Sequence, residues 1–375
     1  MRIDELFLNE DFLPGAAVGR FTGLWGSRLF VQSDVTAEEA RAFADRLREA
    51  GFATLQRRET NGMRYYALQK APYTAHLLHS PTENELRVCL AAQETVPRLT
   101  PDTCEGDGNT VFYAFENDQT LIDCGMCLMV ECPDHSFFMV DSGHYFQPND
   151  NDRIYRFLRE RTPKGQKVRV CGWLITHAHT DHVCKLMDFL KYNTDDVVIE
   201  GFYHNLLPPD YAIWDGNHEE AHIAAKLLAA LADYPAPVYT LHTGMRFYVR
   251  SLAFDVLSTH EDLHPAFIDD YNDSRHFREC FSAFSCCLHL FELFVISVQI
   301  PDTHCRKLVV AAHHFTDCPV QGSGRFLRII HDRNHQVRNP VVNGQFNFLR
   351  IDHDEFQIVR RNLVKQTDNQ CINAH

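Results

Sequence analysis

Two motifs that would point directly to a function are missing from the 375 residues of this chain. It contains no glycine-rich phosphate-binding loop and no GxSxG segment, which are the signatures of phosphate-loop nucleotide binding and of many serine hydrolases. Positive charge is also scarce, because 36 Lys and Arg stand against 50 Asp and Glu and leave a net charge of −14. We therefore expect no stable nucleic-acid binding, although a phosphodiester substrate held at a metal is compatible with this charge.

The beginning of the chain lacks the apolar core of a secretory signal, since MRIDELFLNE is charged from its second residue. We therefore expect a cytoplasmic protein whose 13 cysteines are reduced. One long apolar stretch spans residues 281–300, but His289 and Glu292 lie near its middle. This pattern favours buried strands over a membrane span, and no membrane partner is predicted.

The length and a hydrophobic fraction of 45% indicate a globular chain with room for two domains. Residues 1–99 are predicted to form a small α+β accessory domain. Thr36 and Glu39 fit a helix capping box, Gly51 is a plausible helix end, and a hairpin should turn at Asn61–Gly62. No catalytic cluster occurs here, so we expect a lid or a dimerisation module; the oligomeric state stays open.

A polar, turn-rich linker over residues 100–109 precedes a segment in which apolar strands and helices alternate. Residues 120–132 and 136–143 are predicted to be paired strands, a helix is expected over 152–161, and a buried strand over 167–176. This alternation predicts a layered α/β architecture.

The last of these strands ends in LITHAHTDHV, residues 174–183, where three histidines and an aspartate follow one another closely. Residues two apart face the same side of an extended backbone, so His177, His179 and Asp181 should point together. His182 begins the next predicted helix. Imidazole nitrogen and carboxylate oxygen are ligands for zinc, iron or manganese, and four donors can serve one ion or two adjacent ions.

THAHTDH after an apolar strand resembles the HxHxDH signature of the metallo-β-lactamase-fold hydrolases. The preceding strand pair resembles the opening hairpin of that fold, which ends in Asp-x-Gly, here Asp141 and Gly143. IEGFYHNLLPPD and FDVLSTHEDLHP, followed by Asn272 and Ser274, resemble later segments of one bacterial branch. The resemblance covers residues 110–274. It implies an α/β (α+β) fold, namely an αββα sandwich of metallo-β-lactamase type preceded by the small α+β domain.

On this resemblance His177 and His179 bind a first metal, and Asp181 and His182 bind a second. Asp181 would also orient or deprotonate the attacking water. The implied cofactor is zinc, as one or two ions, with iron or manganese as alternatives. The implied activity is a metal-dependent hydrolysis in which metal-bound hydroxide cleaves an ester, phosphodiester, lactone or amide bond of a small-molecule or phosphodiester substrate. Asp141 would either hold a ligand histidine by its other ring nitrogen or serve as a strand-end turn residue.

The chain departs from the family pattern after Ser274, where no Gly-Asp follows to supply a bridging aspartate. Asp302, His260 and either His313 or His314 are the candidates to complete the site. The metallo-β-lactamase-like domain is expected to span residues 110–375, with 275–375 as a poorly matching tail of net charge +3. This tail is either divergent or not the native second half, for example through a shifted reading frame. In the latter case, the protein would be a degenerate metal-binding protein of the same fold without hydrolytic activity.

A competing motif is HExxH at His218 to His222, the pattern of zinc proteases. It stands at the start of a predicted helix whose apolar stripe, Ile223, Leu227 and Leu231, is offset from the histidines. We therefore expect a solvated helix face, with a zinc protease as the alternative.

Two further alternatives concern redox chemistry. Cys124 and Cys127 form a CxxC, which would serve a redox or zinc site, but strand alternation would send the two thiols to opposite faces, so strand packing is expected. A redox di-iron site on the same fold is the other alternative.

Overall fold

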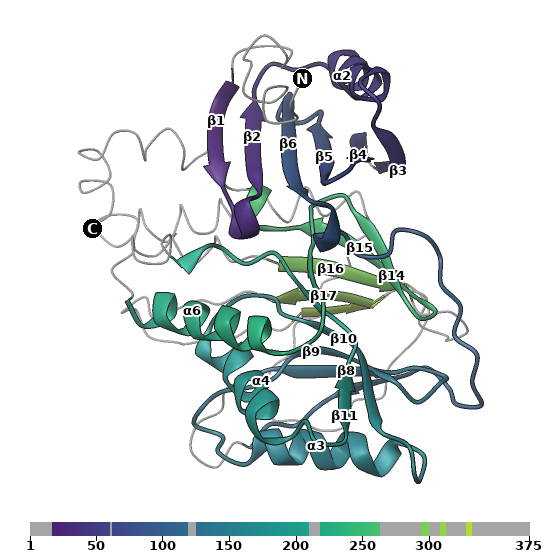
Figure 1. The fold of residues 1–375 in the computed structure, drawn as a ribbon, viewed down its shortest axis with the longest axis vertical. Helices are drawn as coiled ribbons and strands as arrows, with labels where there is room; N and C mark the ends of the chain where they lie inside the picture. The colour runs from purple at the N-terminus through teal and green to yellow at the C-terminus, as the bar shows by residue number, and fades with distance from the viewer. Residues whose placement is uncertain are drawn as a thin grey trace.

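Figure 1 shows the computed structural model of the chain, which describes residues 17–60, 62–118, 125–209 and 218–262 together with three later strands at 294–299, 308–312 and 328–331. Asp302, His313, His314, Asn272 and Ser274 lie outside the described residues. Of residues 17–21, of residues 218–221 and of the three later strands, only the backbone is described.

The first part of the chain forms a six-stranded antiparallel sheet with the order β1-β2-β6-β5-β4-β3. We call this sheet and helix α2 the N-terminal unit. Its strands are β1 (Ala17–Thr22), β2 (Arg28–Gln32), β3 (Ala53–Thr60), β4 (Met63–Lys70), β5 (Tyr73–Ser80) and β6 (Glu85–Ala92), and two short 3-10 helices, η2 (Leu24–Gly26) and η3 (Gln93–Thr95), accompany them. The predicted hairpin around Asn61–Gly62 is the β3–β4 pair.

Helix α2 (Ala37–Glu49) begins with the predicted capping box. The Thr36 hydroxyl accepts a hydrogen bond from the backbone N–H of Glu39, and the Glu39 carboxylate accepts one from the backbone N–H of Thr36. Two backbone donors that lack partners inside the helix are satisfied in this way. The buried face of the helix packs on the sheet and forms a core with it; its members on the helix are Ala40, Phe43, Ala44 and Leu47.

A seven-stranded central sheet follows, with the order β13-β12-β10-β9-β8-β7 and with β11 also paired to β10. The strands β7, β8 and β9 are antiparallel, whereas β9, β10, β12 and β13 run parallel. Their bounds are β7 (Val111–Ala114), β8 (Cys127–Glu131), β9 (Phe137–Asp141), β10 (Val168–Leu174), β11 (Val197–Ile199), β12 (Phe202–His204) and β13 (Val238–Thr240).

Helices α3 (Asp150–Arg161), α4 (Thr180–Tyr192) and α6 (His218–Asp233) cover one face of the central sheet. The other face packs on a third, five-stranded sheet, β14 (Arg246–Val249), β15 (Leu252–Ser258), β16 (Phe294–Gln299), β17 (Leu308–Ala312) and β18 (Arg328–His331). Within the apolar stretch 281–300, the structure describes residues 294–299, and these form strand β16 as predicted. No described helix is long and apolar enough to cross a membrane.

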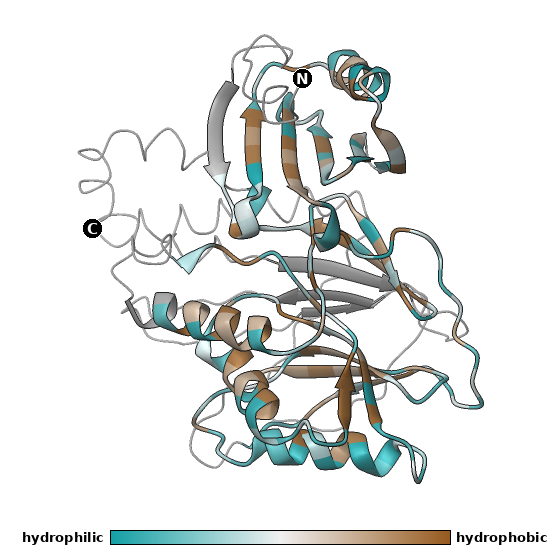
Figure 2. Cartoon of the chain, viewed as in Figure 1, coloured by the Kyte–Doolittle hydropathy of each residue, from teal (hydrophilic) through white to brown (hydrophobic). Residues whose placement is uncertain are grey.

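The near-continuous apolar runs of the central strands follow from burial on both faces. Along β9, Phe137 and Met139 face the helices, whereas Phe138 and Val140 face the third sheet. Across that second interface the rings of Phe138 and Phe254 lie 4.4 Å apart. Figure 2 shows the same pattern, because the central strands are largely brown whereas the helices carry both brown and teal residues.

The predicted mixed α+β class is confirmed, because helices and several sheets occur together in one chain. The described residues show three stacked layers, which are the helices, the central sheet and the third sheet. A second outer helical layer, which an αββα sandwich requires, does not occur among the described residues.

Polar contacts join the N-terminal unit to the rest of the chain. Arg58 of β3 donates a hydrogen bond to the backbone carbonyl of Gly244 at 3.0 Å and pairs with Asp255 at 2.7 Å. Arg87 of β6 pairs with Asp262 as well as with Glu85 of its own strand. Since Arg87 and Asp262 are both buried, these pairs form part of the packed interior.

Candidate metal site

Four neighbouring parallel strands end at the same edge of the central sheet. Asp141 closes β9, the HAHTDH segment follows β10, His204 ends β12, and His242 lies two residues beyond β13. Ligand sites in open α/β sheets form at the carboxyl ends of the strands, so this edge is where a site is expected.

The HAHTDH segment brings its side chains together, although Asp181 lies in helix α4 and not on the extended backbone that was predicted to place it beside His177 and His179. The ring centroids of His177 and His179 lie 4.5 Å apart, and those of His177 and His182 lie 4.0 Å apart. His182 Nε2 lies 3.7 Å from Asp181 Oδ2. All four residues are buried, with exposed fractions of 2% to 7%. Three imidazoles and a carboxylate are therefore concentrated where water has little access.

Helix α4 fixes the second half of this segment. His179 is the N-cap residue, and its carbonyl accepts hydrogen bonds from the backbone N–H groups of His182 and Val183. Asp181 stands in the first turn, where the positive end of the helix dipole favours a carboxylate. The apolar face of the helix, which includes Val183 and Leu186, is buried against the central sheet.

Asp141 has the left-handed backbone conformation, with φ at 55°, directly at the end of β9. Aspartate tolerates this region better than most residues, and such positions concentrate at functional sites. The turn lets the Asp141 carboxylate reach the loop after β10. There it accepts hydrogen bonds from the Thr176 backbone N–H at 2.9 Å, from the Thr176 hydroxyl at 2.7 Å and from His182 Nδ1 at 2.8 Å.

These hydrogen bonds select one tautomer for each of two histidines. His182 must carry its proton on Nδ1 to donate to Asp141, so its Nε2 keeps the lone pair. The Thr176 hydroxyl gives its proton to Asp141 and therefore accepts from His177 Nδ1, which lies 2.9 Å away. His177 consequently keeps its lone pair on Nε2 as well. Metal-binding histidines typically have this arrangement, in which the second ring nitrogen donates to a carboxylate or another acceptor.

The electrostatics of the cluster favour positive charge. Burial by itself would lower the pKa of His182, but the Asp141 and Asp181 carboxylates raise it above its ordinary value. A pair of buried carboxylates that pulls a proton onto a histidine would also stabilise a cation placed between them. The donor set of nitrogen and oxygen atoms thus fits a zinc-class ion in both chemistry and charge.

Ser142 and Gly143 follow the end of β9, and hydrogen bonds join them to helix α4. The Ser142 hydroxyl donates to the His182 carbonyl at 2.7 Å and accepts from the Leu186 N–H at 2.8 Å. Gly143 has φ at 122°, and a Cβ placed on it would lie 2.6 Å from Asn117 Nδ2. The Asp-x-Gly segment is therefore built into the wall of the site, and Asp141 does more than end a strand.

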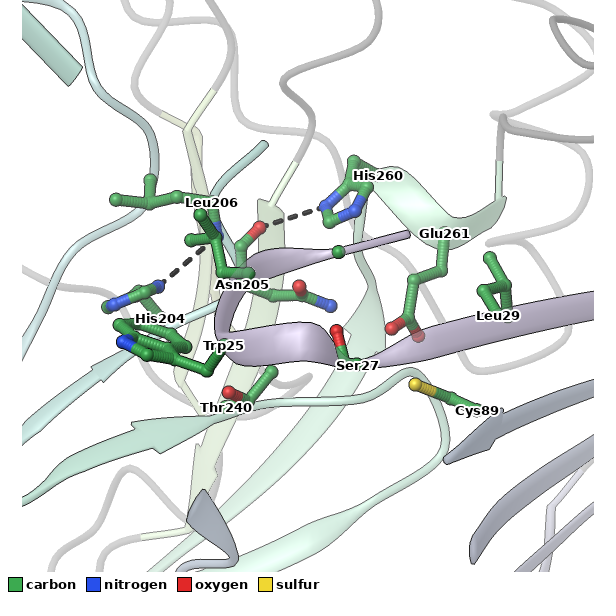
Figure 3. A pocket seen from close by; sticks show the side chains of 12 residues that line it. Trp25, Ser27, Leu29, Cys89, His204, Asn205, Leu206, Thr240, His260 and Glu261 are labelled. Atoms are coloured by element: carbon green, nitrogen blue, oxygen red, sulfur yellow. Dashed lines mark hydrogen bonds between the residues drawn. The ribbon is translucent and has the colours of Figure 1, made fainter. Parts of the chain in front are cut away.

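His260 was a candidate closing ligand, and the structure places it on η5 (His260–Asp262). Its Nδ1 lies 2.9 Å from the backbone carbonyl of Asn205, and burial lowers its pKa. His260 lines a small pocket with His204 and Glu261 (Figure 3). Its role as a closing ligand remains a prediction.

The HExxH helix is α6, as expected, and His222 on it is exposed. The predicted apolar stripe of this helix is confirmed, because Leu227 and Leu231 are buried in the core against the central sheet. Of the CxxC pair, Cys127 is buried among the helices, where burial raises the pKa of its thiol, whereas Cys124 lies outside the described residues. Cys127 lies opposite Asp141 in the β8–β9 pairing.

Sequence reasoning did not single out His204 or His242. Burial, together with nearby His260, lowers the pKa of His204 to about 3, and its Nδ1 accepts from the Leu206 backbone N–H at 3.2 Å. Their positions could have identified them, since His204 ends one parallel strand of the central sheet and His242 closely follows another.

Comparison with known proteins gives no further assignment. No protein-family model matches the chain, and no curated protein matches it.

Proposed function

We propose that the protein is a metal-dependent hydrolase of the metallo-β-lactamase type. The observation that carries this proposal is the Asp141 carboxylate, which fixes two ring tautomers in the HAHTDH cluster so that His177 and His182 both offer Nε2. A cluster that served only packing would gain nothing from this arrangement of lone pairs. The architecture proposed with it is the αββα sandwich, with residues 1–99 as an accessory domain and 110–375 as the catalytic one.

In this proposal His177 and His179 hold one ion, and Asp181 and His182 hold a second where two are bound. Zinc is the expected ion, with iron or manganese as alternatives. A bound ion would supply Lewis acidity and bring the pKa of a coordinated water towards neutrality.

The protein's own residues do the rest. Asp141 and Thr176 keep the rings oriented, and the burial of the cluster excludes bulk water from it. Asp181, on the first turn of α4, orients the attacking water and accepts its proton. The bond cleaved is an ester, phosphodiester, lactone or amide in a small-molecule or phosphodiester substrate.

The first experiment is the metal content of the purified, untagged chain by elemental mass spectrometry, compared with His179→Ala. We expect the variant to lose at least one zinc, iron or manganese ion per chain, together with hydrolysis of a panel that contains a nitrophenyl ester, a nitrophenyl phosphodiester and a lactone. His222→Ala is the matched control, because it removes an exposed histidine from α6.

Unchanged metal content in His179→Ala would overturn the proposal. Loss of peptide cleavage in His222→Ala alone would instead favour the HExxH protease. If the wild-type chain binds metal but hydrolyses none of the substrates, and His179→Ala loses that metal, the second candidate is favoured. That candidate is a degenerate metal-binding protein of this fold.

A further inference from the structure

A second group of metal-binding side chains lies apart from the HAHTDH cluster, where the N-terminal unit meets the edge of the central sheet. Cys89, His242 and Glu261 each offer one donor atom, and these atoms all lie within 4.8 Å of one another. They come from three elements, which are β6, the segment after β13, and η5. All three are buried, with exposed fractions of 4%, 3% and 8%.

We infer that Cys89, His242 and Glu261 bind a zinc-class ion that joins the N-terminal unit to the rest of the protein. A tetrahedral zinc with ordinary Cys and His bond lengths holds its donor atoms roughly 3.5 Å apart. The group therefore needs only a small closure around an ion. His242 Nδ1 and Glu261 Oε1 are joined by a hydrogen bond of 2.8 Å, which an ion bound to both atoms would replace.

The donor set selects the class of ion. A thiolate, an imidazole and a carboxylate suit zinc and its close transition-metal relatives, whereas magnesium and calcium prefer oxygen ligands alone. Charge supports the same choice. A thiolate, a carboxylate and a neutral imidazole carry two negative charges, which one divalent ion neutralises in a buried place.

The neighbouring histidine gives an independent observation. His76 lies opposite Cys89 in the β5–β6 pairing, and its ring stacks on His242 with centroids 4.0 Å apart. Tyr65 holds His76 Nδ1 at 2.8 Å. The Nε2 atoms of His76 and His242 are both buried and have no hydrogen-bond partner among the described residues. Buried nitrogens without partners are uncommon, and two at one place indicate that a group is bound there.

The surroundings indicate a structural role for the ion. Figure 3 shows Cys89 and Glu261 at one side of the small pocket, with Ser27 between them and the Trp25 ring. The cavity has a volume of about 10 Å³, which is room for one water molecule. A water can complete the coordination, but a substrate cannot enter. The ion would therefore stabilise the junction of the two parts.

Cobalt(II) distinguishes this site from the HAHTDH cluster, because Cys89 is the only thiol in either proposed ligand set. We expect the cobalt-loaded full chain to show a thiolate-to-cobalt charge-transfer band in the near ultraviolet. Cys89→Ser and Glu261→Gln should lose that band and one ion per chain, whereas His179→Ala should keep it. Cys171→Ser, which removes another buried thiol, is the matched control.

A stability measurement tests the structural role. In a His179→Ala background, removal of metal with a chelator should lower the unfolding temperature, and Cys89→Ser should abolish this effect. Absence of the band in the wild-type chain, or its persistence in Cys89→Ser, would overturn the inference even where a variant folds poorly. The inference does not rest on the proposed hydrolase. Cys89→Ser tests the metal at Cys89, His242 and Glu261, whereas His179→Ala tests the metal at the HAHTDH cluster.

Discussion

At the scale of single residues, Asp141 has several separate roles. Its backbone ends β9 in the left-handed region, its carbonyl accepts from the Trp173 indole at 3.0 Å, and its carboxylate holds Thr176 and His182. One side chain thus links the central strand to the cluster. A change at this position should alter the cluster before it alters the fold.

We predict that Asp141→Asn weakens zinc binding about 10- to 100-fold, which is the usual loss when a group that holds a metal-binding histidine is changed. The amide has one acceptor oxygen and one NH2 donor, so it cannot accept all three hydrogen bonds that the two carboxylate oxygens accept from Thr176 and His182. Competition with a chromophoric chelator would measure the affinity.

Asp255→Asn is the control for Asp141→Asn, because Asp255 is equally buried but pairs with Arg58 and Arg246. It should reduce stability and leave the affinity unchanged. Equal zinc affinities in wild type and Asp141→Asn would show that Asp141 does not orient the ligands.

At the scale of elements, β10 delivers the HAHTDH cluster and is enclosed on both faces. Gly172 lies at an irregularity in the β9–β10 register, after which Trp173 takes the face that Val170 occupied. A Cβ placed on Gly172 would lie 2.6 Å from a ring carbon of Phe138 and 2.8 Å from one of Tyr203. The strand has no room for a side chain at this position.

We predict that Gly172→Ala lowers the free energy of unfolding by about 1–3 kcal/mol, the range found when a methyl group is forced into a packed core. Denaturant unfolding followed by tryptophan fluorescence would measure it. Val198→Ala, on the exposed face of β11, should cost less than about 1 kcal/mol. A Gly172→Ala variant as stable as the wild type would mean that the two rings can move aside at little cost.

Local sequence patterns predicted several of the described elements, for physical reasons that act over a few residues. The capping box at Thr36, the hairpin around Gly62 and the strand before His177 depend on hydrogen bonds and burial that neighbouring residues determine. The twofold repeat of an extended backbone predicted that His177 and His179 lie together, but it did not predict Asp181, which the first turn of α4 positions.

The second candidate site could not be predicted in this way. Cys89, His242 and Glu261 are far apart along the chain, and no local spacing connects them. Their approach depends on how the N-terminal unit packs against the end of β13, which is a tertiary property. The tautomers of His177 and His182 were also unpredictable, because they follow from a hydrogen-bond chain that only the folded backbone defines.

At the scale of the whole molecule, buried charge crosses the junction between the N-terminal unit and the rest. Arg87 is 5% exposed and pairs with Glu83, Glu85 and Asp262. Although burial by itself would lower the pKa of Arg87, these carboxylates raise it above its ordinary value. The guanidinium is therefore required to balance carboxylates on both sides of the junction.

We predict that Arg87→Leu destabilises the protein by about 3–5 kcal/mol, because it leaves buried carboxylates without their partner. In differential scanning calorimetry a single transition should also separate into two, as the N-terminal unit loses its coupling to the central sheet. Arg48→Ala, which removes a partly exposed ion pair with Asp45 on α2, should cost no more than about 1 kcal/mol. A single, barely shifted transition in Arg87→Leu would show that apolar packing alone joins the two parts.

Arg87 pairs with carboxylates from both parts of the chain, and this limits how the chain can be recombined with others. A chimera that kept the N-terminal sheet and replaced the remainder would bury Arg87 without Asp262. A chimera that replaced the N-terminal sheet and kept the remainder would bury Asp262 without Arg87. The exchangeable module is therefore larger than either sheet. Its smallest self-consistent form must carry β6 and η5 together, so recombination or directed evolution can shuffle surface loops of this protein far more easily than it can transplant either half.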